Sequence, residues 1–174
     1  MEERRRTSIK IVLMTLVCLL FAGCGAHGLK PLVFDGQELH ASLLTPRIED
    51  VQRLHVPRSV LRDNPWISTE ADFVEAIARG GSQGRLDSEG IEAALYALYQ
   101  GETDVGFYGL KAESTAEADR REAELREIWQ HNVSLERARV YRSGQVLLVV
   151  WHDGVSASCW EAVNAAVADR LVAP

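Results

Sequence analysis

The apolar run from Val146 to Trp151 constrains the fold of this chain more than any other segment. It is hydrophobic at every position, and a strand that is apolar on both faces is buried on both sides. Ser143-Gly144 comes before it and follows the possible strand 139–142, so the sequence predicts a hairpin at this point. We therefore expect residues 146–151 to form a central strand of a sheet.

The elements around this hairpin predict an α+β fold. Residues 105–110 have the pattern of a strand, and Ser114 with Glu117 forms a capping box that opens a polar helix. Ser158 with Glu161 is a second capping box, which opens the last helix. The resulting order, β-α-β-β-α, resembles a ferredoxin-like unit without its last strand. We expect a small antiparallel sheet with helices on one side, to which residues 32–44 contribute either the missing strand or a separate hairpin.

The N-terminal half has the pattern of a mostly helical region from residue 44 to residue 100. Thr45-Pro46 is a typical helix start, and Thr69 with Asp72 resembles a capping box. Apolar residues at helical spacing follow each start. A third helix is expected from residue 87 or 88 to Gly101, with Ile91, Leu95 and Leu98 on its inner face.

The composition excludes several classes of protein. The chain has 174 residues, of which 47% are hydrophobic, and this apolar fraction is too high for a disordered chain. Its formal net charge of −6 argues against a nucleic-acid partner, because such proteins need a basic face. We therefore expect one globular domain together with a targeting segment.

The first 24 residues carry that targeting segment. Residues 4–10 contain four basic side chains, and residues 11–23 form an uncharged run of 13 residues. A helix that spans a bilayer needs about 20 apolar residues, so this run has the length of a signal-peptide core.

The end of this run, Phe21-Ala22-Gly23-Cys24, resembles the lipobox of bacterial lipoprotein precursors. The resemblance implies that a lipoprotein signal peptidase cleaves after Gly23, and that the Cys24 thiol carries a diacylglyceryl group. Phe21 departs from the family pattern, which usually has Leu there, and Cys18 does not fit because Val17 before it is not small. The alternatives are an ordinary secretory signal or an uncleaved anchor.

The resemblance divides the chain into a signal peptide (1–23), a lipidated cysteine with a short tether (24–30) and one globular domain (31–174). It implies attachment to the bacterial cell membrane or outer membrane, with the domain facing the periplasm or the exterior. Two acyl chains anchor a protein stably, whereas one gives only marginal binding. The anchor therefore needs no transmembrane helix.

Cys159 and His152 are the candidate catalytic residues. Cys159 falls in the first turn of the last helix, where the helix dipole lowers the pKa of a thiol, and His152 lies shortly before that helix. In such an arrangement the thiol is the nucleophile and the histidine is its base. A free cysteine beside Trp160 is more often a small packed hydrophobe, so this reading is the weaker one.

The remaining candidates give no specific chemistry. The five histidines share no metal-ligand spacing, so the sequence predicts neither a metal site nor a cofactor. Trp129, Trp151 and Trp160 fall on apolar stripes or strands and are expected in the core, whereas Trp66 is expected on a loop.

These observations favour a lipid-anchored envelope lipoprotein that acts by binding. The expected partner is another envelope protein or a cell-wall component, besides the membrane itself. The alternatives are a thiol-dependent enzyme that uses Cys159 and His152, and a purely structural envelope lipoprotein.

Overall fold

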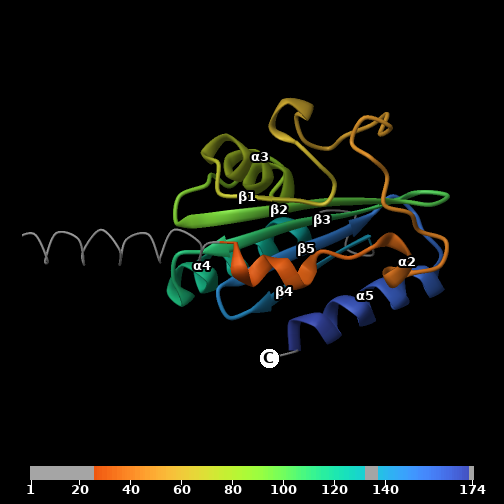
Figure 1. The fold of residues 1–174 in the computed structure, drawn as a ribbon. Coiled ribbons are helices and arrows are strands. Elements are labelled where there is room, and N and C mark those ends of the chain that lie inside the picture. Colours follow the sequence, from red (N-terminus) through yellow and green to blue (C-terminus); the bar gives the residue numbers. More distant parts are fainter. Residues whose placement is uncertain (1–25, 132–136, 173–174) are drawn as a thin grey trace, which may run out of the picture.

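A five-stranded antiparallel sheet with the strand order β1-β2-β3-β5-β4 forms the centre of the protein. The computed structural model describes residues 26–131 and 137–172 (Figure 1). The strands are β1 (Trp66–Ser68), β2 (Ile91–Gln100), β3 (Asp104–Ala112), β4 (Ala138–Ser143) and β5 (Val146–His152). The helices are η1 (His27–Leu32), α2 (Gly36–Leu39), η2 (Arg58–Val60), α3 (Ala71–Gly81), α4 (Thr115–Gln130) and α5 (Ala157–Val172). The fold is therefore α+β, as expected from the sequence.

Strand β5 lies inside the sheet, which confirms the main prediction. It pairs with β3 on one side and with β4 on the other, and all of its residues are buried. Leu148 and Val150 face one side of the sheet, and Leu147 and Val149 face the other. The continuous apolar run therefore reflects burial on both faces.

The predicted β-α-β-β-α order is present as β3-α4-β4-β5-α5. Strands β3 and β4 are both antiparallel to β5 and hence parallel to each other, with β5 inserted between them. The place of the missing strand, on the free side of β3, is taken by β2. The expectation that residues 32–44 supply this strand or form a hairpin was wrong, because this segment contains the short helix α2 and only an isolated bridge from Leu44 to Gln100.

The helix predicted to end at Gly101 was also wrong, because residues 91–100 form strand β2. Ile91, Leu95 and Leu98 have a spacing that suits a helix, but the residues between them are small or apolar as well. Every residue from Ala93 to Tyr99 is completely buried. Such a continuous run fits a strand that is covered on both faces as well as it fits a helix.

Helices cover both faces of the sheet, which corrects the expectation that they lie on one side. Helices α3 and α4 pack on the face that carries Tyr96, Tyr108 and Val149. The opposite face is covered by α5, α2 and η1 (Figure 1). There Trp160, Val163, Val167 and Leu171 of α5 form an apolar stripe that packs against the sheet.

The helix starts agree only in part with the predicted capping residues. Ser114 caps α4 as predicted, because its side chain accepts a hydrogen bond from the Glu117 amide. Helix α3 begins after Glu70, so the Thr69–Asp72 box does not form. In α5 the cap is Ser156, whose hydroxyl oxygen accepts from the Cys159 amide at 3.3 Å, rather than Ser158.

The short helix predicted after Thr45-Pro46 does not form, because residues 45–57 contain only turns and irregular structure. Arg58 holds this segment instead. Its guanidinium donates hydrogen bonds to the carbonyl oxygens of Ile48, at 2.6 Å, and Val51, at 2.5 Å. Val51 and Val56 still enter the core, so their apolar character reflects burial rather than helical structure.

The globular part begins earlier than the expected Pro31. Helix η1 starts at His27, and its Leu29 and Leu32 are buried against β3 and α5. Much of the segment 24–30, expected as a tether, therefore belongs to the folded domain. Across residues 26–131 and 137–172, none of the helices combines the length and the hydrophobicity needed to cross a membrane.

Candidate functional site

A cavity of about 340 Å³ lies at the end of the sheet where β3 begins and β5 finishes. Tyr108 of β3, Trp129 of α4 and Trp151 of β5 form its aromatic wall. The polar groups on the lining include His55, Arg137 and Asp153. The cavity thus combines apolar surface with a few convergent polar side chains, as small-molecule sites do.

The aromatic wall is fixed by close packing. The rings of Tyr108 and Trp151 are stacked, with their centroids 6.2 Å apart and an angle of 28° between their planes. Trp151 lies directly over Gly106 on the neighbouring strand, where a side chain would collide with the indole. The Trp129 indole nitrogen donates a hydrogen bond of 2.9 Å to the carbonyl oxygen of Gly81. These contacts hold the wall in one arrangement.

His55 reaches this cavity from the irregular segment before η2. Its ring packs against Trp151 with the ring centroids 4.2 Å apart. Its Nε2 atom is buried and has no hydrogen-bond partner among the described residues; the nearest carboxylate oxygen, Oδ2 of Asp153, is 4.0 Å away. Burial lowers the pKa of His55, while the negative charge of Asp153 partly opposes this shift. The ring is therefore neutral at pH 7.

Asp104 completes a group of three possible metal ligands with His55 and Asp153, whose ligand atoms all lie within 4.8 Å of one another. The Gln100 side-chain amide donates a hydrogen bond of 3.1 Å to Oδ1 of Asp104. The backbone carbonyl of Asp104 accepts a hydrogen bond of 2.9 Å from the Asp153 amide. The two aspartates are thus held on adjacent strand ends.

No local sequence pattern marks this group, because its members come from three distant segments. A local pattern, such as two histidines three or four residues apart, is absent, and only the pairing of β3 with β5 brings Asp104 and Asp153 together. One feature of the sequence could have indicated part of the group. Asp104 directly precedes one predicted strand and Asp153 closely follows another, and these two strand ends lie side by side when the strands pair antiparallel.

The structure places Cys159 and His152 in different cavities. His152 lines the cavity described above, and its Nδ1 accepts hydrogen bonds from the amides of Gly154 at 3.0 Å and Val155 at 3.1 Å. Cys159 lines a second cavity of about 330 Å³, together with Ser42. Burial raises the pKa of the Cys159 thiol, whereas the helix start was expected to lower it. Burial is the larger cause of this pKa shift, and the side-chain hydrogen bond with Ser42 opposes it only in part.

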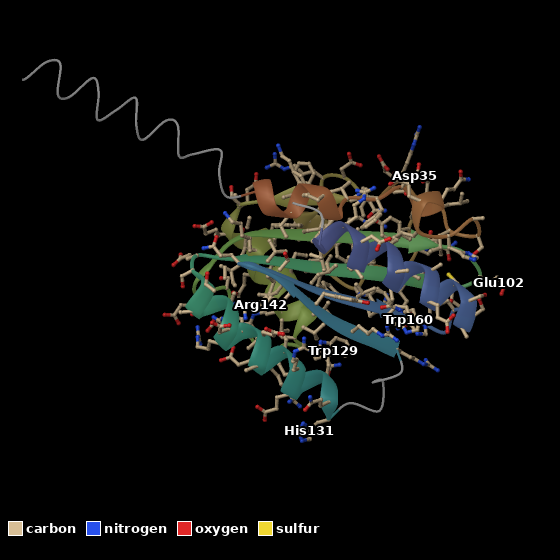
Figure 2. The ribbon with its side chains drawn as sticks, turned by 90° about the horizontal axis from the view of Figure 1, so that it is seen from below. Asp35, Glu102, Trp129, His131, Arg142 and Trp160 are labelled. Carbon is tan, nitrogen blue, oxygen red and sulfur yellow. The ribbon has the colours of Figure 1, made fainter. Side chains whose placement is uncertain are left out.

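The tryptophans differ from the expectation at one position. Trp151 and Trp160 are buried, and Trp129 packs against the core, as predicted. Trp129 on α4 and Trp160 on α5 lie on separate sides of the sheet (Figure 2). Trp66 belongs to strand β1 and is half-buried, so the prediction of a loop position was wrong. An exposed aromatic groove is therefore not built around Trp66.

Cys24 lies outside the described residues. Comparison with protein-family models, with curated proteins and with solved structures finds no significant match to this chain.

Proposed function

We propose that this chain is a lipid-anchored extracytoplasmic lipoprotein of a bacterial envelope, and that its domain acts by binding a ligand in the cavity at the end of the sheet. The lipobox-like sequence that ends at Cys24 supports the anchor. The observation that carries the binding role is the cavity itself, where a packed aromatic wall meets the polar side chains of His55, Arg137 and Asp153.

The surroundings of Cys159 favour binding over thiol catalysis. A nucleophilic cysteine needs a lowered pKa and a base within hydrogen-bond reach, because the thiolate is the reactive form. Here burial raises the pKa of Cys159, and the Nδ1 atom of His152 accepts two backbone hydrogen bonds. These contacts support a structural role for both side chains.

The anchor gives the binding role its mechanism. A domain held in the plane of a membrane meets membrane-bound or cell-wall partners at a raised effective concentration, so a modest affinity is sufficient. The burial of Leu29 keeps the domain close to Cys24, since five extended residues span at most about 18 Å. The partners within reach are therefore other envelope proteins and cell-wall components near the same bilayer.

Metabolic labelling with palmitate tests the anchor. We expect the full-length protein to incorporate the label and to fractionate with membranes, and we expect Cys24→Ala to remain an unlabelled precursor of higher mass. Cys18→Ala is the matched control and should label like the wild type. Labelled, processed Cys24→Ala would exclude the proposed cleavage site.

Site-specific photo-crosslinking in intact cells tests the binding role. A photoreactive residue in place of Arg137, on the cavity lining, should give one defined adduct with an envelope or cell-wall component. The same residue in place of Glu161, which is exposed on α5, is the control and should not give that adduct. Identical products from both positions, or none from either, would contradict the proposal.

A further inference from the structure

We infer that His55, Asp104 and Asp153 form a binding site for a divalent transition-metal ion at the edge of the cavity. The inference deepens the proposed binding role, on which it rests, by naming the chemical class of a ligand. The three side chains come from the segment before η2, from the start of β3 and from the turn after β5. Their ligand atoms converge to within 4.8 Å of one another.

The state of His55 is the first argument. A histidine beside an aspartate usually forms a hydrogen bond or an ion pair, with the two heavy atoms about 2.7–3.2 Å apart. Here Nε2 of His55 and Oδ2 of Asp153 are 4.0 Å apart, and Nε2 is buried without a hydrogen-bond partner among the described residues. A buried polar atom without a partner carries a free-energy cost, which a bound ion would remove.

The spacing of the ligand atoms is the second argument. Oxygen and nitrogen ligands lie about 2.0–2.2 Å from Zn²⁺, so two ligands of one tetrahedral ion are separated by about 3.3–3.6 Å. Nε2 of His55 and Oδ2 of Asp153, at 4.0 Å, lie about 0.5 Å further apart than this, so an ion would draw them slightly together. The Asp153 side chain is 44% exposed, so it has room to turn toward the ion.

The support around the ligands is the third argument. Metal-binding residues are commonly held in place by outer hydrogen bonds and packing. The Gln100 amide holds Oδ1 of Asp104 at 3.1 Å, which leaves the second oxygen for an ion. The Trp151 indole packs on the His55 ring and limits its rotation. The hydrogen bond from the Asp153 amide to the Asp104 carbonyl oxygen fixes the two backbone segments relative to each other.

The ligand set selects the class of ion. Imidazole favours zinc and other transition metals, whereas sites made of oxygen atoms alone favour Mg²⁺ and Ca²⁺. One histidine with two carboxylates therefore suits Zn²⁺ and Mn²⁺ better than Ca²⁺. Three protein ligands leave at least one coordination position open, and the cavity lies beside it. Arg137 on the same lining would favour an anionic group at that position.

Zinc titration of the full-length protein tests the inference. The protein is extracted from membranes in a non-ionic detergent, freed of metal with a chelator and titrated with ZnCl₂ by calorimetry. We expect saturable binding of one Zn²⁺ per chain. His55→Gln, Asp104→Asn and Asp153→Asn should each weaken zinc binding at least about tenfold. Loss of a residue that only supports a ligand already weakens metal binding about 10–100-fold, and loss of the ligand itself should weaken it no less.

Three further variants separate a built site from surface binding. His131→Gln and Asp50→Asn remove an exposed histidine and an exposed aspartate elsewhere and should leave the affinity for Zn²⁺ unchanged. Gln100→Ala removes the hydrogen bond that supports Asp104 but removes no ligand. It should weaken zinc binding about 10–100-fold, as loss of outer-shell support typically does. Thermal unfolding of each variant without metal checks that it is folded.

Absence of one-to-one zinc binding by folded wild-type protein would overturn the inference, and so would equal affinities for the wild type and His55→Gln. Ca²⁺ binding as tight as Zn²⁺ binding would overturn the assigned ion class. These outcomes are distinct from failure of the proposed function, which the palmitate label and the crosslinked adduct report without reference to metal.

Discussion

Gly106→Ala is the substitution that most directly tests how the cavity wall is built. A Cβ atom at this position would lie 2.1 Å from Cζ2 and 2.2 Å from Cε2 of the Trp151 indole. Ordinary carbon contacts are about 3.5–4.0 Å, so the indole has to move by more than about 1 Å. It is packed against Tyr108 and His55 and cannot do so freely.

The sign of the effect is diagnostic. Where the backbone accepts alanine without a clash, Gly→Ala stabilises a protein by about 0.4–1 kcal/mol, because it restricts the unfolded chain. Forcing an extra methyl group into a packed core instead costs about 1–3 kcal/mol. We therefore expect Gly106→Ala to lower the free energy of unfolding by about 1–3 kcal/mol.

Urea unfolding of the full-length protein in detergent, followed by far-UV circular dichroism, measures this change. The control is a double-mutant cycle with Trp151→Leu, which removes the ring atoms that the new methyl group would meet. In that background the cost of Gly106→Ala should disappear, which corresponds to a coupling energy of about 1–3 kcal/mol. A more stable Gly106→Ala single variant, or a cost that persists in Trp151→Leu, would refute the reasoning.

Three other perturbations have defined outcomes. Leu148→Asp should abolish folding, measured by circular dichroism, because it buries an unpaired charge in β5. Cys159 should react slowly with a thiol reagent at neutral pH and rapidly in denaturant, because burial raises its pKa in the folded protein. Fast reaction of the folded protein would instead support the thiol-dependent enzyme. A hydrogen bond from Arg120, and a weaker contribution from Arg121, lower the pKa of Glu117 in the folded protein. The Glu117 carboxylate therefore stabilises the fold fully at pH values above its ordinary pKa of about 4.3, and this stabilisation is lost as the pH falls further. Glu117→Gln should flatten the loss of stability in acid, and an unchanged pH profile would contradict this.

The C-terminal half of the fold could be predicted because its signals are local and strong. The apolar run of β5, the Ser143-Gly144 turn and the Ser114 cap each determine one element with few alternatives. The i, i+4 pair of Glu117 and Arg121 also forms, at 2.8 Å. In addition, Arg121 is almost fully buried and reaches Asp87, a contact that no local pattern could indicate.

The N-terminal half was harder to predict because its elements depend on distant partners. Strand β2 has the composition of a helix, with alanines throughout, and becomes a strand because β1 and β3 pair with it on both sides. Asn64 shows the same dependence: its side-chain amide exchanges hydrogen bonds of 2.8 Å with the backbone of Leu98, more than thirty residues away.

The candidate site was beyond prediction for the same physical reason. Cys159 and His152 were the sequence candidates because they are close along the chain, whereas the converging groups are His55, Asp104 and Asp153. Only the register of β3 with β5 places these two aspartates together.

The direction of β5 places the start of the folded chain and the cavity at different ends of the same strand. Gly28, close to the chain's entry into the fold, packs against Val146 at the first residue of this strand, whereas the cavity is lined by the strand's last residues. Six steps along a strand cover about 20 Å. In the proposed lipoprotein, the chain would therefore enter the fold about one strand length from the binding pocket, so that an envelope or cell-wall partner could occupy the pocket without displacing the anchored end of the domain.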